Sequence, residues 1–331
     1  MSDHRPRYGA AMAEMAPDGL KIGITVSPHI PAGDFVAYVR RIEELGFHEV
    51  WIVEDCFLHG AVAQAATALA ATKSVRVGLG IIPAAARNVA FAAMEIATLA
   101  GLHPGRLTVG VGHGIGSWLE QAGVRPPRPL TLLEEYIRVL RQLLAGDEVT
   151  FDGRYLQLRG VRLAHVPPVV PPVLAGVRGP RSLRLSGQVA QGTILAEPVT
   201  PEYLAFARTR IAAADHQLVA YNLASVDDDP GVARSQVRGS LAVVGEPDWE
   251  PHVAVLDFAA ELKELRRGAG SAAAFAAAVP DSWVDRLAIV GRPDVAREQL
   301  LDLHRSGADR ISLIPAGPGL FSPLDSLARL L

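Results

Sequence analysis

Eight short apolar segments that alternate with longer helical patterns predict an α/β fold, a single (β/α)8 TIM barrel with a helical insertion before the last strand. The short segments are apolar at nearly every position, which is typical of parallel strands buried on both faces. The competing fold, a Rossmann sheet with a second domain, requires a glycine fingerprint directly after the first strand. The sequence there is SPHIPAGD, so the closed barrel is the predicted fold.

The strands are expected where short, β-rich apolar runs occur, such as KIGITV near the start of the chain and RISLIP near its end. Their number and spacing match the eight strand–helix units of one barrel. The expected strands are residues 21–26, 49–54, 75–80, 106–111, 172–176, 192–197, 217–224 and 310–315.

Amphipathic or alanine-rich segments between these strands predict the helices. Gly46 ends the first helix, and Pro180 and Pro201 begin two later ones. The pair Asp152-Gly153 lies between alternating residues and predicts a β-hairpin outside the main repeat. The expected helices are residues 34–46, 60–72, 90–101 and 131–146, the segments that begin at the two prolines, a long helical region of roughly 229–306, and 323–331.

The chain is expected to form one domain with an N-terminal extension. Residues 1–20 contain acidic side chains and no continuous apolar run, so we expect a flexible leader and neither a secretion signal nor an anchor. Residues 21–331 are expected to form the barrel domain. Within it, residues 225–282 contain DDDPG and an alanine run, and are interpreted as an insertion before the last strand.

Composition excludes several classes of function. With 331 residues, 49% of them hydrophobic, the chain is long enough for a sizeable core. A net charge of −3 with both signs spread along the chain provides no field for nucleic acid or for a membrane surface. No apolar run approaches the roughly 18 residues of a membrane helix. The single cysteine, Cys56, excludes an internal disulfide and a multi-cysteine zinc site, and we expect a cytoplasmic protein.

Ligands of barrel proteins bind at the C-terminal ends of the strands, and the end of the fifth strand, GVRGPRS, is the most informative. Its glycines would let the backbone approach a ligand, and Pro180 suits the first position of a helix. The next N–H groups point out of the helix start, where the macrodipole favours an anion. Arg178 and Arg181 could add positive charge. The alternative is a capped turn with surface arginines. The candidate residues are Gly176, Val177, Arg178, Gly179, Pro180, Arg181 and Ser182.

The end of the fourth strand, GVGHGIGSW, is a second candidate. Its glycines leave bare backbone over which a flat ring or a polar tail can lie, although a crowded barrel rim also needs small residues. His113 stands between Gly112 and Gly114, which favours a ligand contact over a place in the packed core.

Catalytic motifs are few. The sequence has no G-x-S-x-G, no H-E-x-x-H and no Walker A motif, and its ten histidines lack the spacing of a metal site, so no metal is expected. The acidic pair Glu134-Glu135 lies on a helix and is expected to be solvated. Asp55 and Cys56 end a buried strand at the barrel mouth and are candidates for catalysis. So few acid–base groups indicate chemistry supplied by a bound cofactor.

The order of GFHEVWIVED, HPGRLTVGVGHGIGSWLEQAG, VTFDGRYLQLRGVRL, GVRGPRSLRLSGQVAQGTILAE and IVGRPDVAREQLLDLHRSGADRISLIP resembles the luciferase-like superfamily. Within it, the chain is most similar to oxidoreductases of the methylene-tetrahydromethanopterin reductase type, which use coenzyme F420, a deazaflavin. The resemblance spans about residues 21–315.

The resemblance implies a barrel that holds F420, or alternatively FMN, at its C-terminal mouth. It implies a cis peptide bond between Gly80 and Ile81, which forms a bulge behind the ring. It also implies that the loops at residues 112–114 and 176–182 hold the cofactor's phosphate and side chain. The implied reaction is hydride transfer between C5 of the deazaflavin and a small organic substrate, with residues 225–282 as part of a lid. Barrels of this type are often dimers, so a homodimer is one option.

The chain departs from the family in three places, and the first two put the catalytic acid in doubt. Many relatives have Asp-His after the second strand where this chain has Asp55-Cys56, and many have a glutamate in the first-strand loop where it has Ser27-Pro28-His29. The usual ADG before the sixth strand is AQG. His29, His59 or Glu197 could replace the missing acid, and we expect Trp118, His59 and Glu197 to contact the substrate. Two other readings stay open, an FMN-dependent monooxygenase with a separate reductase and a barrel that has lost catalysis.

Overall fold

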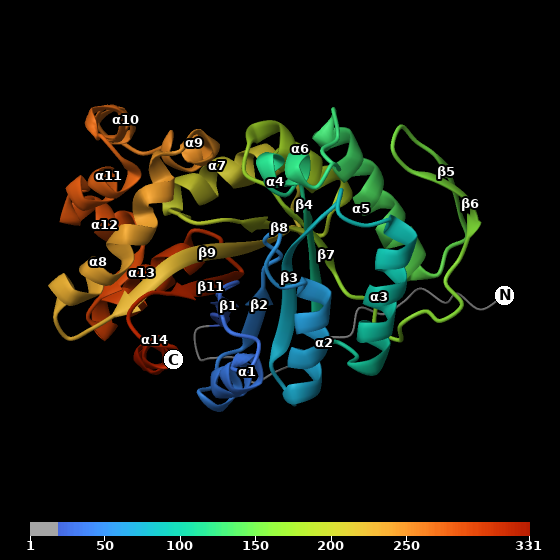
Figure 1. The fold of residues 1–331 in the computed structure, drawn as a ribbon, viewed down its shortest axis with the longest axis horizontal. Helices are drawn as coiled ribbons and strands as arrows, with labels where there is room; N and C mark the ends of the chain where they lie inside the picture. The colour runs from blue at the N-terminus through green and yellow to red at the C-terminus, as the bar shows by residue number, and fades with distance from the viewer. Residues whose placement is uncertain (1–18) are drawn as a thin grey trace.

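The structure, a computed structural model, describes residues 19–331 and contains a closed barrel of parallel strands (Figure 1). The expected leader, residues 1–20, lies outside the described residues except for its last two, of which Leu20 is buried. The barrel strands are β1 (Ile22–Val26), β2 (Glu49–Ile52), β3 (Arg76–Pro83), β4 (Leu107–Gly112), β7 (Val173–Gly176), β8 (Gly192–Leu195), β9 (Gln217–Val226) and β11 (Arg310–Pro315).

The barrel closes because every strand has a parallel neighbour on both sides. The order around the barrel is β1, β2, β3, β4, β7, β8, β9 and β11, and β11 pairs in turn with β1. All pairs between neighbouring barrel strands are parallel, so the eight C-terminal ends lie at one mouth of the barrel. The predicted fold is therefore confirmed.

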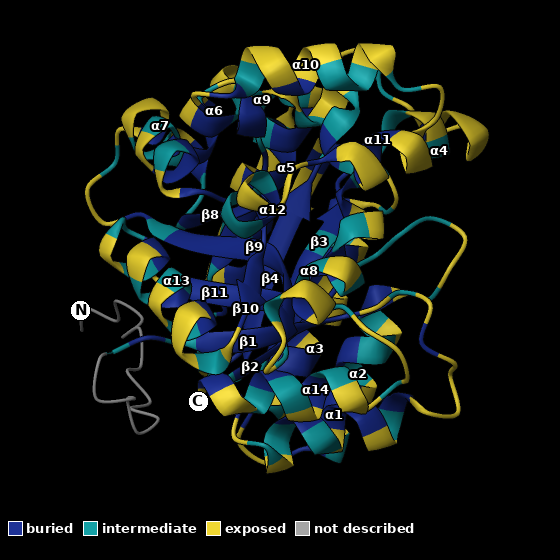
Figure 2. Cartoon of the chain, turned by 90° about the vertical axis from the view of Figure 1, so that its left-hand side faces the viewer, coloured by how far each residue is buried: buried dark blue, intermediate teal, exposed yellow. Residues whose placement is uncertain are grey.

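Helices surround the barrel and bury one face each against it, as Figure 2 shows by the dark blue strands and the yellow outer helix faces. Local capping fixes several helix ends: the Asn88 side chain accepts from the N–H of Ala90, and the Thr200 side chain accepts from that of Tyr203. The outer helices are α1 (Phe35–Glu44), α2 (Ala61–Ala71), α3 (Val89–Leu102), α4 (Gly116–Gln121), α5 (Pro129–Ala145), α6 (Pro180–Val189), α7 (Pro201–Ile211), α13 (Pro293–Arg305) and α14 (Ser322–Leu327), which the short helix η3 (Ala328–Leu330) follows.

The segment between β9 and β11 forms a group of short helices with its own apolar cluster, which includes Phe275 and Val284. In Figure 1 this group, in orange, lies beside α7 and β9. It also contains a short strand, β10 (Ile289–Gly291), which pairs with β9, so the expectation of an unbroken helical region at 229–306 is wrong there. The helices are α8 (Pro230–Arg238), η1 (Gly239–Gly245), η2 (Pro247–Trp249), α9 (Glu250–Val253), α10 (Ala259–Gly268), α11 (Ala272–Ala278) and α12 (Asp281–Leu287).

The predicted hairpin is present as β5 (Val149–Asp152) and β6 (Gln157–Val161). Its turn is held by Glu135 of α5, whose carboxylate accepts hydrogen bonds from the backbone N–H groups of residues 154, 155 and 156 at 2.8–3.1 Å. Glu135 is 8% exposed, so the expectation of a solvated glutamate pair is wrong for this residue. The reason is tertiary: the hairpin folds back along α5 and covers the side chain.

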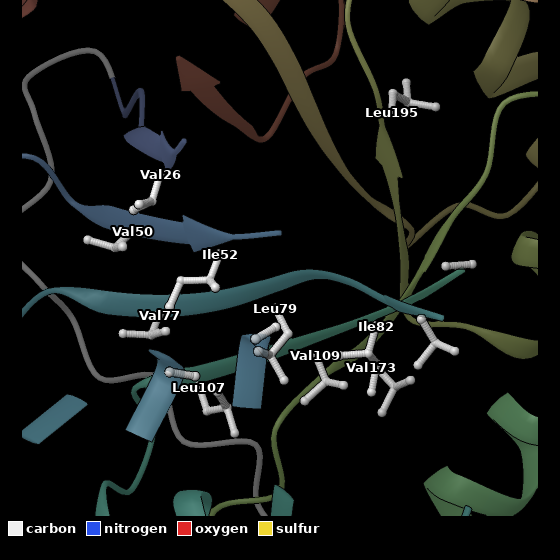
Figure 3. Packing of buried hydrophobic residues seen from close by; sticks show 14 of the residues in the cluster. Val26, Val50, Ile52, Val77, Leu79, Ile82, Leu107, Val109, Val173 and Leu195 are labelled. Atoms are coloured by element: carbon white, nitrogen blue, oxygen red, sulfur yellow. The ribbon is translucent and has the colours of Figure 1, made fainter. Parts of the chain in front are cut away.

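Two apolar layers fill the fold. The larger one lies between the strands and the outer helices, where side chains from neighbouring strands pack side by side (Figure 3). The smaller one fills the barrel interior and includes Trp51, Ile194 and Tyr221, with Ile81 packed against it. Below it, at the N-terminal ends of the strands, Glu49 accepts a hydrogen bond from the Trp51 indole at 2.9 Å and pairs with Arg310 at 3.3 Å.

None of the helices in residues 19–331 combines the length and the apolar character that crossing a membrane would require.

Candidate active site

The candidate site residues from seven different segments lie at or just beyond the C-terminal ends of the barrel strands, because the strands are parallel and in the order given above. They lie in the last residues of β3, β4 and β7 or in the segments that follow β1, β2, β4, β7 and β8, and Trp118 lies on α4. This placement makes the mouth of the barrel the candidate active site.

A bulge in β3 forms one wall of the mouth. The peptide bond between Gly80 and Ile81 is cis, and the pairing of β3 with β4 shifts register between Leu79 and Ile82. After the shift, the Ile81 side chain packs against the apolar cluster inside the barrel, whereas Ile82 is buried in the outer layer. The cis bond and the bulge are those that the sequence resemblance implied.

The glycines at the ends of β4 and β7 make room for Ile81. A Cβ placed on Gly176 would lie 2.2 Å from Ile81 Cγ2, and one on Gly112 would lie 3.0 Å from Ile81 Cδ1 and 2.8 Å from the carbonyl oxygen of Gly176. Gly176 is therefore required for packing inside the barrel. Ile81 fills the space beside Gly176, and the expected approach of a ligand to the Gly176 backbone stays a prediction.

Below the bulge, the hydroxyl of Tyr221 points at Gly80. A Cβ on Gly80 would lie 1.9 Å from this oxygen, so only glycine fits there. Within the described residues the hydroxyl is fully buried and has no hydrogen-bond partner. Burial raises the pKa of Tyr221 well above its ordinary value, and Glu49 and Glu197 add to the rise, so the phenol stays protonated.

The loops after β4 and β7 approach each other through His113 and Ser182, whose Nε2 and Oγ atoms lie 3.3 Å apart. Burial lowers the pKa of His113, the backbone of Pro129 opposes the shift, and Arg178 lowers it further, which favours the neutral imidazole. Helix α6 begins after Gly179, which has no side chain to cap the first turn, and a Cβ on Gly179 would meet nothing within 4 Å. This first turn therefore has no side-chain cap, and the anion site expected there stays a prediction.

The Arg178 side chain contacts the insertion. Its guanidinium carbon lies 4.5 Å from the centre of the Trp249 ring, and its Nη1 donates to the carbonyl oxygen of Asp248 at 3.3 Å. Its own carbonyl oxygen accepts from the Tyr203 hydroxyl at 2.8 Å. Arg178 thus attaches the insertion to the barrel rim through a cation–π contact, and its charge acts on His113 and Glu197 at the mouth. Its expected role beside the ligand stays a prediction.

The loop after β2 contains Asp55, Cys56 and His59. Burial raises the pKa of Asp55, and the charge of the exposed His29 opposes the rise. Burial also raises the pKa of the Cys56 thiol, as do Glu54 and Asp55, so the reactive thiolate is disfavoured. The ring N–H of His59 donates to the carbonyl oxygen of Ile30 at 3.0 Å, which ties this loop to the one after β1.

Glu197 follows β8 and brings a second carboxyl group to the mouth. Burial raises its pKa; its own backbone N–H and Arg178 oppose the shift, and Asp55 increases it. Trp118 is half-buried. Among residues 19–331 there is no group of His, Cys, Asp and Glu side chains that could hold a metal ion.

Sequence reasoning missed the residues that organise the rim from a distance. Trp249 and His252 lie in the insertion, where no motif marked them. Glu54 forms a two-pronged ion pair with Arg87, with both N–O distances 2.8 Å, and so joins the loops after β2 and β3. Charged residues just after two consecutive strands are the only signal that could have indicated this pair.

These features define the class: a (β/α)8-barrel protein with a cis-peptide bulge in its third strand and a candidate site at the C-terminal mouth. The chain belongs to the luciferase-like monooxygenase family, whose model matches residues 11–310.

Relatives cover most of the chain. The 5,10-methylenetetrahydromethanopterin reductase of Methanolobus tindarius is 31% identical over 315 residues, a match that covers 90% of this chain and 95% of that protein. The F420-dependent glucose-6-phosphate dehydrogenase of Beutenbergia cavernae is 32% identical over 175 residues, 49% of this chain and 52% of that protein. Among solved structures, the coenzyme F420 dependent tetrahydromethanopterin reductase of Methanopyrus kandleri has a TM-score of 0.82 at 20% identity, over 94% of this chain and 98% of that one. That likeness supports the fold.

Proposed function

We propose that this protein is an F420-dependent oxidoreductase that transfers a hydride between the deazaflavin and a C=C, C=N or C=O group of a small organic molecule. The observation that carries the proposal is the 31% identity to a methylenetetrahydromethanopterin reductase over 90% of the chain. A second relative, whose name states F420 dependence, matches about half of the chain, and this supports the choice of cofactor.

The residues at the mouth fit such a cofactor. Ile81 offers an apolar surface at the bulge, which suits the face of a flat ring. The uncapped first turn of α6 and the open space beside Gly179 suit an anionic group of the cofactor's side chain, and the exposed Arg181 adds positive charge there. His113, from the loop after β4, and Ser182, from the first turn of α6, bring neutral hydrogen-bonding groups to the same place.

When bound, the deazaflavin supplies or accepts a hydride at C5. The chain's contribution is to orient the reacting groups and to exclude water. The apolar interior closes the floor of the site through Trp51 and Tyr221, whose rings pack edge to face with centres 5.7 Å apart. The insertion, residues 225–282, borders the mouth through Trp249, and we propose that it covers part of the bound substrate.

Titration of the purified protein with F420 and, separately, with FMN tests the proposal. Quenching of the intrinsic fluorescence of each cofactor reports its dissociation constant. We expect F420 to bind at least tenfold more tightly than FMN, and the loaded protein to exchange hydride with a set of small carbonyl compounds and alcohols. Tight binding of FMN without binding of F420 would instead favour the flavin-dependent monooxygenase. Cofactor binding without turnover of any compound would favour a non-catalytic barrel.

We expect the assembly to be a monomer or a homodimer and the protein to act in the cytoplasm. Sedimentation velocity of the full chain measures its assembly state.

A further inference from the structure

Two acidic residues lie at the mouth on opposite sides of the barrel. In the strand order, β2 and β8 are four positions apart in a ring of eight, so their C-terminal ends face each other across the axis. Asp55 follows β2 and Glu197 follows β8. Both residues therefore lie at the mouth, on opposite sides of it, and the charge of Asp55 acts on the Glu197 carboxyl.

The backbone around Glu197 is fixed by three side chains from three elements. The Trp249 indole donates to the carbonyl oxygen of Glu197 at 2.8 Å. The His252 imidazole donates from Nδ1 to the carbonyl oxygen of Pro198 at 3.1 Å. The Asn222 amide bonds both the N–H and the carbonyl oxygen of Val199, at 2.9 and 3.1 Å. A side chain on such a segment starts from a defined position, which acid–base catalysis requires.

The carboxyl group itself is left free for other partners. In the described part of the chain it forms no ion pair, whereas Glu54 and Glu202 each pair with an arginine. Glu197 is partly accessible to solvent although it lies deep among protein atoms, as expected of a side chain that lines a cleft.

We propose that Glu197 is the catalytic acid–base residue of the hydride transfer, giving a proton to the substrate heteroatom in reduction and taking it back in oxidation. This inference rests on the proposed function. For a C=O substrate, the carbon accepts the hydride that reduced deazaflavin supplies, and the electron pair of the π bond moves to oxygen. The new O–H bond forms as the O–H bond of the Glu197 carboxyl breaks. The resulting carboxylate regains its proton from solvent.

The other candidates serve this role less well. His59 uses its ring N–H in a bond to Ile30, and His29 is exposed at the rim. Asp55 lies opposite and affects Glu197 by its charge. The charged and titratable groups that act on the Glu197 carboxyl are Arg178 from the loop after β7 and Asp55 from the loop after β2, and the Tyr221 hydroxyl of β9 responds to Glu197 in turn. Arg178 favours the carboxylate, whereas burial and Asp55 favour the neutral acid.

Thermal unfolding of the cofactor-free protein tests the environment of Glu197 without any turnover. A raised native pKa means that the native state binds a proton more tightly than the unfolded chain, so stability falls as pH rises from about 4.5 through the raised value. The Glu197→Gln variant has no such titrating group and should not lose stability in this way as pH rises. We expect the variant to melt at the wild-type temperature near pH 4 and above it at pH 8, by about 2 °C for each unit of pKa shift.

Glu202→Gln is the matched control. Glu202 pairs with Arg286, and although burial opposes the shift, its own backbone N–H, Thr200 and Arg286 lower its pKa. This variant should therefore melt below the wild type at pH 8 and approach it at low pH. A Glu197→Gln variant that melts at or below the wild-type temperature at every pH would overturn the placement of the carboxyl and, with it, the proposal.

Kinetics of the F420-loaded enzyme test the role. We expect Glu197→Gln to lower kcat for carbonyl reduction by roughly 10²–10⁴-fold with the F420 dissociation constant unchanged. The wild-type kcat/KM for reduction should fall as pH rises through the pKa of Glu197, and the variant should lose this dependence. Unchanged kcat in the variant would disprove the role. If wild-type protein binds no F420, the proposed function fails, while the unfolding experiment still reports on Glu197.

Discussion

The Ile81 side chain occupies the space in which a side chain on Gly176 would stand, 2.2 Å from the position of a Cβ there. The two residues lie on β3 and β7, strands that β4 separates. Ile81 reaches across because the cis bond and the bulge in β3 turn it into the barrel. Gly176 at the end of β7 is thus required because the bulge in β3 places Ile81 beside it.

Gly176→Ala should destabilise the protein by about 1–3 kcal/mol, because the added methyl group overpacks the site against Ile81. Gly179→Ala is the matched control, since a Cβ there meets nothing within 4 Å and the backbone φ is −86°. Urea denaturation of both variants measures the difference. Equal midpoints for the two variants would contradict the packing argument.

The Gly179→Ala variant also tests whether the first turn of α6 binds the cofactor. If the first turn of α6 holds an anionic group of the cofactor, Gly179→Ala and Arg181→Gln should each weaken F420 binding by about 1–3 kcal/mol while leaving the stability of the free protein unchanged. Fluorescence titration measures the affinity. Wild-type affinity in both variants would show that this turn only connects a strand to a helix.

Tyr221→Phe should leave the ligand-free protein as stable as the wild type, or up to about 1 kcal/mol more stable. The reason is that its buried hydroxyl makes no hydrogen bond within the described residues, and an unpaired polar group is costly to bury. Chemical denaturation measures this. A loss of more than 1 kcal/mol would mean that the hydroxyl has a partner in solution, such as a buried water.

Trp249 attaches the insertion to the barrel in two ways, by its indole N–H and by the face of its ring. Trp249→Phe retains a ring for Arg178 and should cost about 1 kcal/mol, whereas Trp249→Ala loses both contacts and should cost roughly 2–3 kcal/mol. Limited proteolysis should cut residues 239–258 faster in the alanine variant. Identical digestion patterns in all three proteins would show that the insertion docks without Trp249.

Stability should fall in mild acid partly through His216. Burial, with Arg208, lowers its pKa from 6.5 to about 4, and its Nε2 lies 2.8 Å from the Thr193 hydroxyl. Because the native state resists protonation, its stabilising contribution is complete above pH 6.5 and is lost as pH falls toward 4. The wild type should therefore exceed His216→Gln in urea midpoint most clearly at pH 7.5. A difference that stays constant down to pH 4 would contradict this.

Much of the fold was predictable because its signals are local. Apolar runs marked every barrel strand to within a few residues, and Pro180 and Pro201 marked the starts of α6 and α7. The short strand β10 was missed because three residues inside a helical region carry too little pattern to be distinguished from it. Glu135 was misjudged because its burial depends on a hairpin that is adjacent in space but not in the helix pattern.

The site was predictable only in part. Its place at the mouth followed from the parallel order of the strands, and the bulge at Gly80–Ile81 followed from a resemblance. The roles of Arg178 and Gly176 did not follow, because each depends on a partner from a distant segment: Trp249 lies 71 residues after Arg178, and Ile81 lies 95 residues before Gly176.

The sequence by itself determined the barrel, since the alternation of apolar and helical segments is fixed along the chain and needs no partner. It also predicted a candidate ligand site at the C-terminal ends of the strands. Only the tertiary structure decided which side chains act together there. Barrel closure sets Glu197 opposite Asp55, and the insertion places Trp249 and His252 against the segment after β8. Burial, which exists only in the folded chain, then makes the pKa of one carboxyl group differ from that of another.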